Sequence, residues 1–351
     1  MKIKIIGVVC LIFCGVFSSE VTLSQSGKNG FNPEKNRTLR LMFYNVENLF
    51  DTIENPNAND EDFLPGGTRN WNGYRYYQKK NRIYKTIMAA GGWSPPELIG
   101  LCEIENETVL EELLWNTPFS KFEYKYIHKN SPDHRGIDVA LLYDPERFFP
   151  ISERFIRLQL PEEFSSTREI LYSKGHTKQN DTLHVFVNHW PSKYGGAVKS
   201  QPKRNIAAKT LKAVADSILK TEKKAKIIIT GDFNDGPRAE SIKEFLAVNT
   251  IKDSIIDQNL YSLSEHWSDE ISGTYKYQGQ WNIIDQFIVS GSLLKNSNNL
   301  KTSKEDAHIF APPFLLEKDE KYIGKKPYRT YIGFKYNNGF SDHLPIILDL
   351  H

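Results

Sequence analysis

Seven short apolar runs constrain the fold of this chain more than any other feature of the sequence. Each has five to seven residues with a high content of isoleucine, valine or leucine, which favours β-strands over helices. The stretches at residues 227–229 and 346–348 are apolar at every position, so the strands that contain them must be covered on both faces. The predicted strands are Leu39–Asn45, Leu98–Ile104, Asp138–Tyr143, Leu183–His189, Lys226–Thr230, Ile283–Val289 and Pro345–Leu350.

Three stretches between these strands have helical periodicity. From Lys203 to Lys220, apolar residues recur at steps of four, three and four, which gives one apolar stripe along a helix. Residues 75–90 show the same spacing, and Asn106 is suited to cap a short helix that ends at Trp115. Strands mixed with a few helices predict an α/β or α+β layered sandwich.

The N-terminal segment has the order of a secretory signal peptide. A basic start at residues 1–4 is followed by an apolar run at 5–16 and then by small and polar residues. The apolar run is shorter than the ~20 residues that span a bilayer. We therefore expect a cleaved signal at 1–24, a polar tether at 25–38, one domain at 39–351, no stable membrane span, and export to the periplasm or the cell exterior. An uncleaved anchor and a lipid-modified Cys14 are the alternatives.

The composition indicates a globular protein but does not indicate which kind of partner it binds. With 39% hydrophobic and 25% charged residues, the chain is of the ordinary globular type. After cleavage only Cys102 would remain, so the apolar core rather than a disulfide must stabilise the fold. We also expect a monomer. The net charge of +2 neither requires nor excludes a nucleic-acid partner, because a local basic groove is compatible with a weak overall charge.

Polar side chains follow the predicted strands at the points where the apolar runs stop. The first run ends at Asn45, with Glu47 two positions further on. A carboxylate or imidazole at a strand end is held rigidly at the edge of a sheet without being buried unpaired. Five such ends carry Asn, Asp, Glu or His, which indicates one shared site. The other four ends carry Glu103, Asn188 with His189, Asp232 with Asn234, and Asp342 with His343.

These residue types indicate the chemistry of such a site. Carboxylate and amide oxygens suit a hard cation such as Mg²⁺, with Mn²⁺ or Ca²⁺ as alternatives. Histidines suit proton transfer near neutral pH, and asparagine amides donate to phosphate oxygens without adding charge. A cation, histidines and neutral donors together fit the attack of water on a phosphate ester.

The same motifs, in this order, resemble the endonuclease/exonuclease/phosphatase superfamily over residues 39–351. That superfamily includes pancreatic deoxyribonuclease, abasic-site endonucleases, neutral sphingomyelinases and inositol polyphosphate phosphatases. Cys102 stands where the family usually has Gln, and Gln286 where an aromatic residue or His is common, but neither change removes a catalytic group. The matching features are Asn45 and Glu47, Glu103, His189, the intact Gly-Asp-Phe-Asn at 231–234, Asp285 in a late apolar strand, and Ser-Asp-His at 341–343.

The resemblance implies a four-layered sandwich in which two mixed β-sheets pack face to face with helices outside. It further implies a metal-dependent hydrolase of phosphoester bonds, here an exported bacterial-type member. Glu103 would hold the cation, with contributions from Asn45 and from Asp342 or Glu47.

The resemblance also implies a division of labour among the other site residues. Asp232 and Asn234 would orient the attacking water and the phosphate. His343 would act as base, steered by Asp285 or by the aspartate that precedes it. His189 would stabilise the phosphate or protonate the leaving oxygen.

Two cations outside these motifs are candidates for contact with the substrate. Arg135 opens the strand at 138–143, and Lys193 follows His189 on a glycine-rich loop. Either side chain would bind a phosphate, or else lie in a solvated turn. Arg204 is a weaker candidate for the same loop.

Rival functions fit the motifs less well. The segment 231–235 also matches the Gly-Asp-x-x-Asp box of calcineurin-like phosphoesterases, but the chain lacks their early Asp-x-His and late Gly-His-x-His. A non-catalytic binding module would usually have lost one of the catalytic residues. Among substrates we favour nucleic acid, cleaved by a nuclease-like phosphodiesterase, with a phospholipid of the sphingomyelin type or a small phosphoester as the alternative.

Overall fold

Two mixed β-sheets form the framework of residues 37–351, which the computed structural model describes apart from residues 93, 253, 268–270 and 296–299. One sheet has six strands in the order β14-β19-β1-β2-β4-β3, and the other has seven in the order β5-β6-β7-β8-β13-β10-β9. The six strands are β1 (Leu39–Leu49), β2 (Leu98–Ile104), β3 (Lys125–His128), β4 (Asp138–Tyr143), β14 (Ala307–Ile309) and β19 (Ile346–Leu350). The seven are β5 (Phe148–Ile156), β6 (Ile170–Thr177), β7 (Thr182–His189), β8 (Lys226–Asp232), β9 (Val248–Asn249), β10 (Leu260–Ser262) and β13 (Asp285–Ser290).

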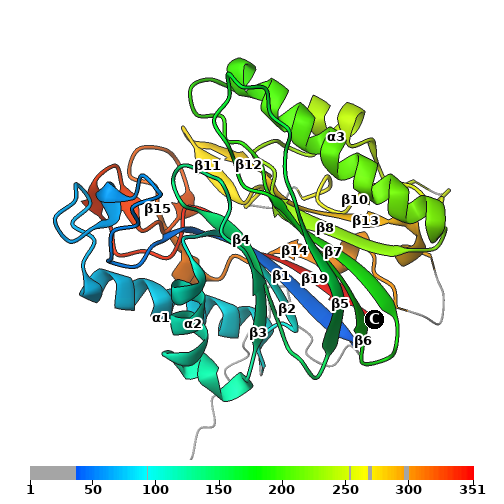
Figure 1. Cartoon of the computed structure of the whole chain (residues 1–351), viewed down its shortest axis with the longest axis horizontal. Coiled ribbons are helices and arrows are strands. Elements are labelled where there is room, and N and C mark those ends of the chain that lie inside the picture. Colours follow the sequence, from blue (N-terminus) through cyan, green and yellow to red (C-terminus); the bar gives the residue numbers. More distant parts are fainter. Residues whose placement is uncertain (1–36, 93, 253, 268–270, 296–299) are drawn as a thin grey trace, which may run out of the picture. The chain divides into compact units, whose positions relative to one another are not determined.

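Helices cover the outer face of each sheet (Figure 1). Helices α1 (Gly73–Gly91) and α2 (Glu107–Trp115) pack on the six-stranded sheet, and α3 (Ala197–Thr221) packs on the seven-stranded sheet. The inner faces meet in an apolar core to which β1, β7 and β13 contribute Phe43, Val187 and Val289. The predicted four-layered α/β sandwich is therefore confirmed.

The seven strands and three helices predicted from the sequence all occur. Strands β2 and β4 have the predicted bounds, and the other elements have shifted ends. Asn106 caps α2 as expected, because its side-chain oxygen accepts a hydrogen bond from the Val109 N–H at 3.0 Å. Helix α3 begins at Ala197, ahead of Pro202, whereas periodicity indicated a start only at Lys203. The sequence pattern missed β5 and β6, because much of β5 is exposed and β6 mixes polar with apolar residues.

Within the described residues, three two-stranded hairpins lie outside the two large sheets. They are β11 (Tyr275–Tyr277) with β12 (Gln280–Asn282), β15 (Leu316–Lys318) with β16 (Lys325–Pro327), and β17 (Tyr331–Ile332) with β18 (Lys335–Tyr336). The predicted signal peptide at 1–24 and residues 25–36 of the tether lie outside the described residues, so both stay predictions. No helix in the described part of the chain is long and apolar enough to cross a membrane.

Strand pairing brings the predicted polar strand ends to one edge. Strands β1 and β2 run parallel, with Asn45 opposite Cys102, and β7 and β8 run parallel, with His189 opposite Asp232. The antiparallel strand β13 begins with Asp285 opposite Asp232. Because parallel strands finish at the same edge of a sheet, both sheets present their polar ends to one place.

Gly231 allows β7 and β8 to approach closely beside this edge. Its φ is +152°, and an added Cβ would lie 2.3 Å from the carbonyl oxygen of Asn188. Only glycine fits this position without displacing the neighbouring backbone.

Candidate active site

The polar side chains converge on one carboxylate oxygen, Oδ2 of Asp232. It accepts a hydrogen bond from Asn45 Nδ2 at 3.1 Å, and it lies 3.7 Å from His189 Nε2 and 3.9 Å from His343 Nε2. The other oxygen, Oδ1, accepts from the Asn234 N–H at 2.9 Å. Burial raises the pKa of Asp232 to about 7, although a protonated His343 opposes this shift.

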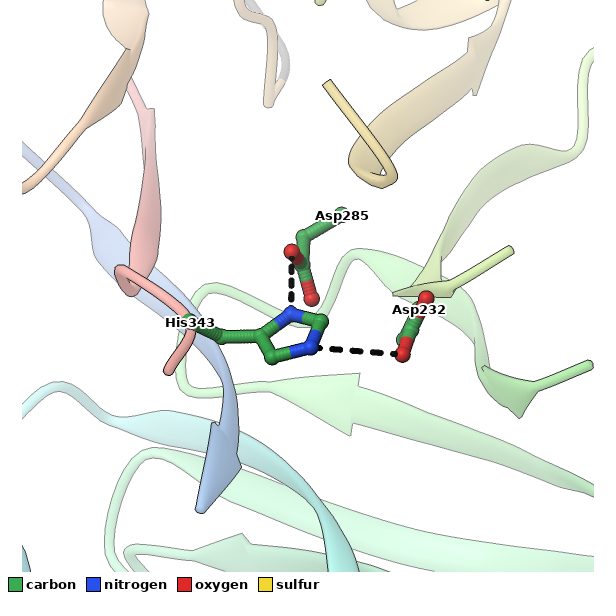
Figure 2. Close-up of side chains that lie close together, drawn as sticks. All are labelled: Asp232, Asp285 and His343. Atoms are coloured by element: carbon green, nitrogen blue, oxygen red, sulfur yellow. Dashed lines mark hydrogen bonds and ion pairs between the residues drawn. The ribbon is translucent and has the colours of Figure 1, made fainter. Parts of the chain in front are cut away.

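His343 forms a buried pair with Asp285 (Figure 2). Its Nδ1 lies 2.8 Å from Asp285 Oδ2, and the two residues are 6% and 1% exposed. Burial alone disfavours the imidazolium, but the carboxylates of Asp285 and Asp232 raise the pKa of His343 well above its usual value. The ring of Tyr275 packs on the imidazole with centroids 4.9 Å apart. The pair therefore has a fixed orientation, with Nε2 directed at Asp232.

Ser341 has a structural role beside this pair. Its hydroxyl donates to the Asn45 carbonyl oxygen at 2.7 Å and accepts from the His343 N–H at 3.1 Å. This single side chain ties the segment before β19 to the end of β1. The Ser-Asp-His sequence is thus not a serine-hydrolase triad, since the hydroxyl is committed to main-chain contacts.

Glu103 occupies the adjoining corner of the site. Its Oε1 accepts from Asn45 Nδ2 at 3.1 Å and lies 3.9 Å from His189 Nε2, and its Oε2 accepts from the Asn48 N–H at 2.9 Å. Glu103 has a φ of +64°, a conformation that non-glycine residues seldom adopt. Asn48 and Asn234 also have positive φ, so strained backbone gathers around these carboxylates, as it often does at functional sites.

His189 is held neutral by its surroundings. Burial, with the nearby charges of Arg168 and Arg135, lowers the pKa of His189 well below its usual value. Arg168 fixes the chain here, since it donates to the carbonyl oxygens of His189 at 3.2 Å and Trp190 at 2.7 Å. Its third contact is a buried ion pair with Asp133 at 2.8 Å.

Arg168 was not predicted from the sequence. It precedes β6, a strand that the apolar pattern did not reveal, so its position at a strand start was hidden. The sequence signal for Arg168 was limited to the polar residues Thr167-Arg168-Glu169 directly before the segment that begins with Ile170.

The structure places Glu47 and Asp342 beside the central group, on either side of Arg329. Arg329 Nη2 lies 2.9 Å from Asp342 Oδ2, and its Nε lies 3.4 Å from Glu47 Oε1. Asp342 Oδ1 is 4.0 Å from His343 Nε2, which connects this pair of acids to the central group. Arg329 was not predicted from the sequence, because it lies at no predicted strand end and in no recognised motif.

The remaining candidates lie further out. Arg135 is 37% exposed and pairs with Asp133 at 3.3 Å, and Lys193 is 46% exposed and pairs with Asp235 at 3.3 Å. Neither forms an ion pair with the central carboxylates among the described residues. Arg204 is fully buried and forms an ion pair with Asp235 at 2.7 Å, so its role is to hold Asp235 in place rather than to contact a substrate.

The profile of the Endonuclease/Exonuclease/phosphatase family matches residues 40–351 of this chain. The chain belongs to this family. Members of the endonuclease/exonuclease/phosphatase family are phosphoester hydrolases that typically depend on a divalent cation. No curated protein matches the sequence significantly.

Solved structures of the endonuclease/exonuclease/phosphatase family share this fold at low sequence identity. The human Nocturnin catalytic domain with a bound sulfate anion is 17% identical, with a TM-score of 0.52 over 90% of this chain and 95% of that one. TDP2 of D. rerio in complex with a single-strand DNA product is 13% identical, with a TM-score of 0.54 over 89% and 98%. A family protein from Bacteroides vulgatus is also 13% identical, with a TM-score of 0.53 over 89% and 98%.

The donor set fits the divalent cation that the family implies. Glu103 and Asp232 are close through Asn45, and no lysine or arginine forms an ion pair with either carboxylate within the described ranges. Glu103, without a lysine or arginine partner, leaves local negative charge for a bound cation to offset. Asn45 adds a polar group between Glu103 and Asp232.

A second grouping of possible ligand atoms is Asp232, Asp285 and His343, whose atoms lie within 4.8 Å of one another. The short contact with Asp285 engages Nδ1 of His343, so Nε2, which faces Asp232, is the ring nitrogen that remains for a proton or a cation.

Proposed function

We propose that this protein is a metal-dependent phosphodiesterase that cleaves nucleic acid with an activated water. The observation that carries this proposal is the convergence of two imidazole nitrogens and one amide on Oδ2 of Asp232, next to Glu103. A site with acceptors, donors and a proton carrier around one point suits in-line attack of water on a phosphate.

Glu103, with Asn45, would hold the divalent cation. When bound, the cation would withdraw charge from a phosphate oxygen as a Lewis acid. Glu103 is suited to this because its side chain is 15% exposed and so remains accessible at the edge of the buried site. Its hydrogen bonds from Asn45 and Asn48 fix the direction of both carboxylate oxygens.

Proton transfer would fall to His343 and Asp285. The raised pKa of His343 means that its imidazole is a strong proton acceptor, and the Asp285 carboxylate stabilises the imidazolium that forms. Asp232 would hold the attacking water through an oxygen that faces Nε2 of His343. Asn234 would support Asp232, because its N–H donates to Oδ1 and its side chain to the Trp190 carbonyl oxygen at 3.0 Å.

His189 would act as a neutral donor to the phosphate. Its lowered pKa makes it a poor proton donor at neutral pH but leaves it a hydrogen-bond donor. This supports the phosphate-stabilising role over protonation of the leaving oxygen. Arg135 and Lys193 stay predicted contacts for a longer substrate at the rim of the site.

Nucleic acid is the substrate class that we favour. TDP2 was solved with a single-strand DNA product, and Nocturnin holds a sulfate, an anion of the same geometry as phosphate. These likenesses, at 13% and 17% identity, support the choice of phosphoester chemistry. A phospholipid or a small phosphoester is the alternative on the same site.

A substrate panel with two site variants tests the proposal. The purified protein is assayed on single-strand DNA, RNA, sphingomyelin and bis-p-nitrophenyl phosphate with Mg²⁺, Mn²⁺ or EDTA. We expect cleavage of a nucleic acid that EDTA abolishes, with a loss of at least ~10²-fold in His343→Ala and Asp232→Ala. His134→Ala, an exposed histidine outside the site, is the matched control. Full activity in Asp232→Ala would refute the mechanism, and cleavage of sphingomyelin alone would refute the substrate class.

We also propose that the protein is exported through its predicted signal at residues 1–24. The charge and hydropathy order of that segment supports this. Expression with and without residues 1–24, followed by fractionation of the cells, tests it. Equal retention of both forms in the cytoplasm would contradict export.

A further inference from the structure

Arg329 lies between two acidic residues that the sequence marks as candidate metal ligands. Its Nη2 is 2.9 Å from Asp342 Oδ2 and its Nε is 3.4 Å from Glu47 Oε1. One guanidinium therefore bridges the two carboxylates. In two-metal sites the second divalent cation lies about 3.5–4 Å from the first, and neighbouring carboxylates such as Glu47 and Asp342 are the kind of ligands that would hold it.

The carboxylate of Glu47 is already fully used by the protein. Its Oε2 accepts from the Thr330 N–H at 2.6 Å, and its Oε1 accepts from the Tyr331 N–H at 3.4 Å. The residue is 5% exposed. A divalent ion bound to Glu47 would have to displace these main-chain donors, at the cost of leaving buried N–H groups unpaired.

A buried lysine completes the charge balance. Lys79 on α1 is 1% exposed, and its Nζ donates to Thr330 Oγ1 at 2.5 Å and to the Phe340 carbonyl oxygen at 2.6 Å. Two protein cations, Lys79 and Arg329, thus accompany the two acids. Glu103 differs sharply, because it has no lysine or arginine partner within the described part of the chain.

We propose that Arg329 takes the place of a second metal ion, so that the protein binds a single divalent cation at Glu103. Glu47 and Asp342 are then positioning residues. They hold the segment from Arg329 to His343 against β1 and α1, and so fix the imidazole at the end of that segment. This inference rests on the proposed function, because it concerns the cation of the same site.

Metal stoichiometry tests the inference without reference to turnover. Mn²⁺ binding to the full chain is measured by isothermal titration calorimetry, and the bound metal is counted by mass spectrometry after equilibrium dialysis. We expect one ion per chain. Glu47→Gln should change the Kd less than about threefold, whereas Glu103→Gln should weaken binding by more than about tenfold. Two ions per chain in the wild-type protein, with one lost in Glu47→Gln, would overturn the proposal.

The arginine itself is tested by a matched series. Arg329→Met removes the guanidinium from between the two carboxylates and leaves Asp342 without its arginine partner, so a second Mn²⁺ should bind there at millimolar concentration. Arg329→Lys keeps the charge and should stay at one ion. Arg154→Met removes a positive charge from β5, away from the site, and should also stay at one. One ion in a folded Arg329→Met protein would overturn the role of Arg329, and circular dichroism establishes folding.

The outcomes separate this inference from the proposed function. Two ions together with EDTA-sensitive cleavage of DNA would defeat the single-cation inference alone. One ion with no hydrolysis of any phosphodiester would defeat the proposed function alone. No Mn²⁺ binding at all would defeat both.

Discussion

Replacing Asp285 by asparagine removes one charge and almost no volume from the proposed catalytic pair. In the wild-type protein Oδ2 lies 2.8 Å from His343 Nδ1, and both residues are nearly inaccessible to solvent. The amide oxygen of the substituted side chain could still accept a hydrogen bond, but it would no longer offset the imidazolium charge. A hydrogen bond to a charged group contributes about 1.5–3 kcal/mol. If that contribution is realised when His343 takes the proton, kcat should fall roughly 10- to 150-fold.

The same change should move the pH dependence in a defined direction. The Asp285 carboxylate raises the pKa of His343, so Asp285→Asn lowers it. A base must be neutral to act, so activity rises with pH through this pKa. The acid limb of the profile should therefore shift to lower pH in the variant, even though the maximal rate falls.

Initial rates on bis-p-nitrophenyl phosphate, measured from about pH 5 to 10 at saturating Mg²⁺, give both quantities. Asp257→Asn is the matched control, because it removes an aspartate charge from a surface pair with Lys295. A double variant with His343→Ala shows whether the two residues act together, since the Asp285 effect should then vanish. A fall of less than about threefold with an unmoved acid limb would refute the role of Asp285.

Three further predictions concern stability, each measured by urea unfolding. Gly231→Ala should lower the free energy of unfolding by about 2–4 kcal/mol because its Cβ would meet the Asn188 carbonyl, whereas Gly73→Ala, with open space at the start of α1, should be neutral or stabilising. Lys79→Met should cost about 3–5 kcal/mol, since it leaves two buried acceptors unpaired and removes one of the two cations near Glu47, and a loss below about 1 kcal/mol would contradict this. The pKa of Asp133 is lowered, against the effect of burial, by Arg168 and Arg135. Its ion pairs therefore contribute fully to stability above about pH 5. The difference in free energy of unfolding between the wild-type protein and Asp133→Asn should become smaller as pH falls below about 4, through the lowered folded-state pKa of Asp133. A difference that grows in acid would contradict this.

The apolar runs predicted the framework well because the buried strands are uninterrupted in sequence. Strands β2 and β4 have the predicted bounds, since both of their faces are covered and each run ends where polar residues begin. Strand β5 escaped detection because it is largely exposed and contains Pro150, features that resemble a loop. An apolar pattern reports burial, so it reveals an exposed edge strand poorly.

The site residues likewise divide into those that the apolar runs revealed and those that they did not. Asn45, His189 and Asp232 were found because each stands where a buried apolar run stops, although β1 itself continues to Leu49. Strand register then pairs His189 with Asp232. Arg168 and Arg329 were missed because neither lies at the end of a predicted strand. Their importance depends on contacts across the chain, which no local spacing of residues encodes.

The spacing between the proposed catalytic groups is set by how closely the two sheets approach. Asn45 and Glu103 come from the six-stranded sheet and Asp232 from the seven-stranded one, and the Asn45 amide joins the two carboxylates. Below the site the sheets meet at Gly100, where an added Cβ would lie 3.3 Å from both methyl groups of Val187. A larger side chain there would push the sheets apart, and a misplacement of about 1 Å can lower a rate ~10²-fold. A core position three residues before Glu103 therefore sets the geometry of the site without contacting the substrate.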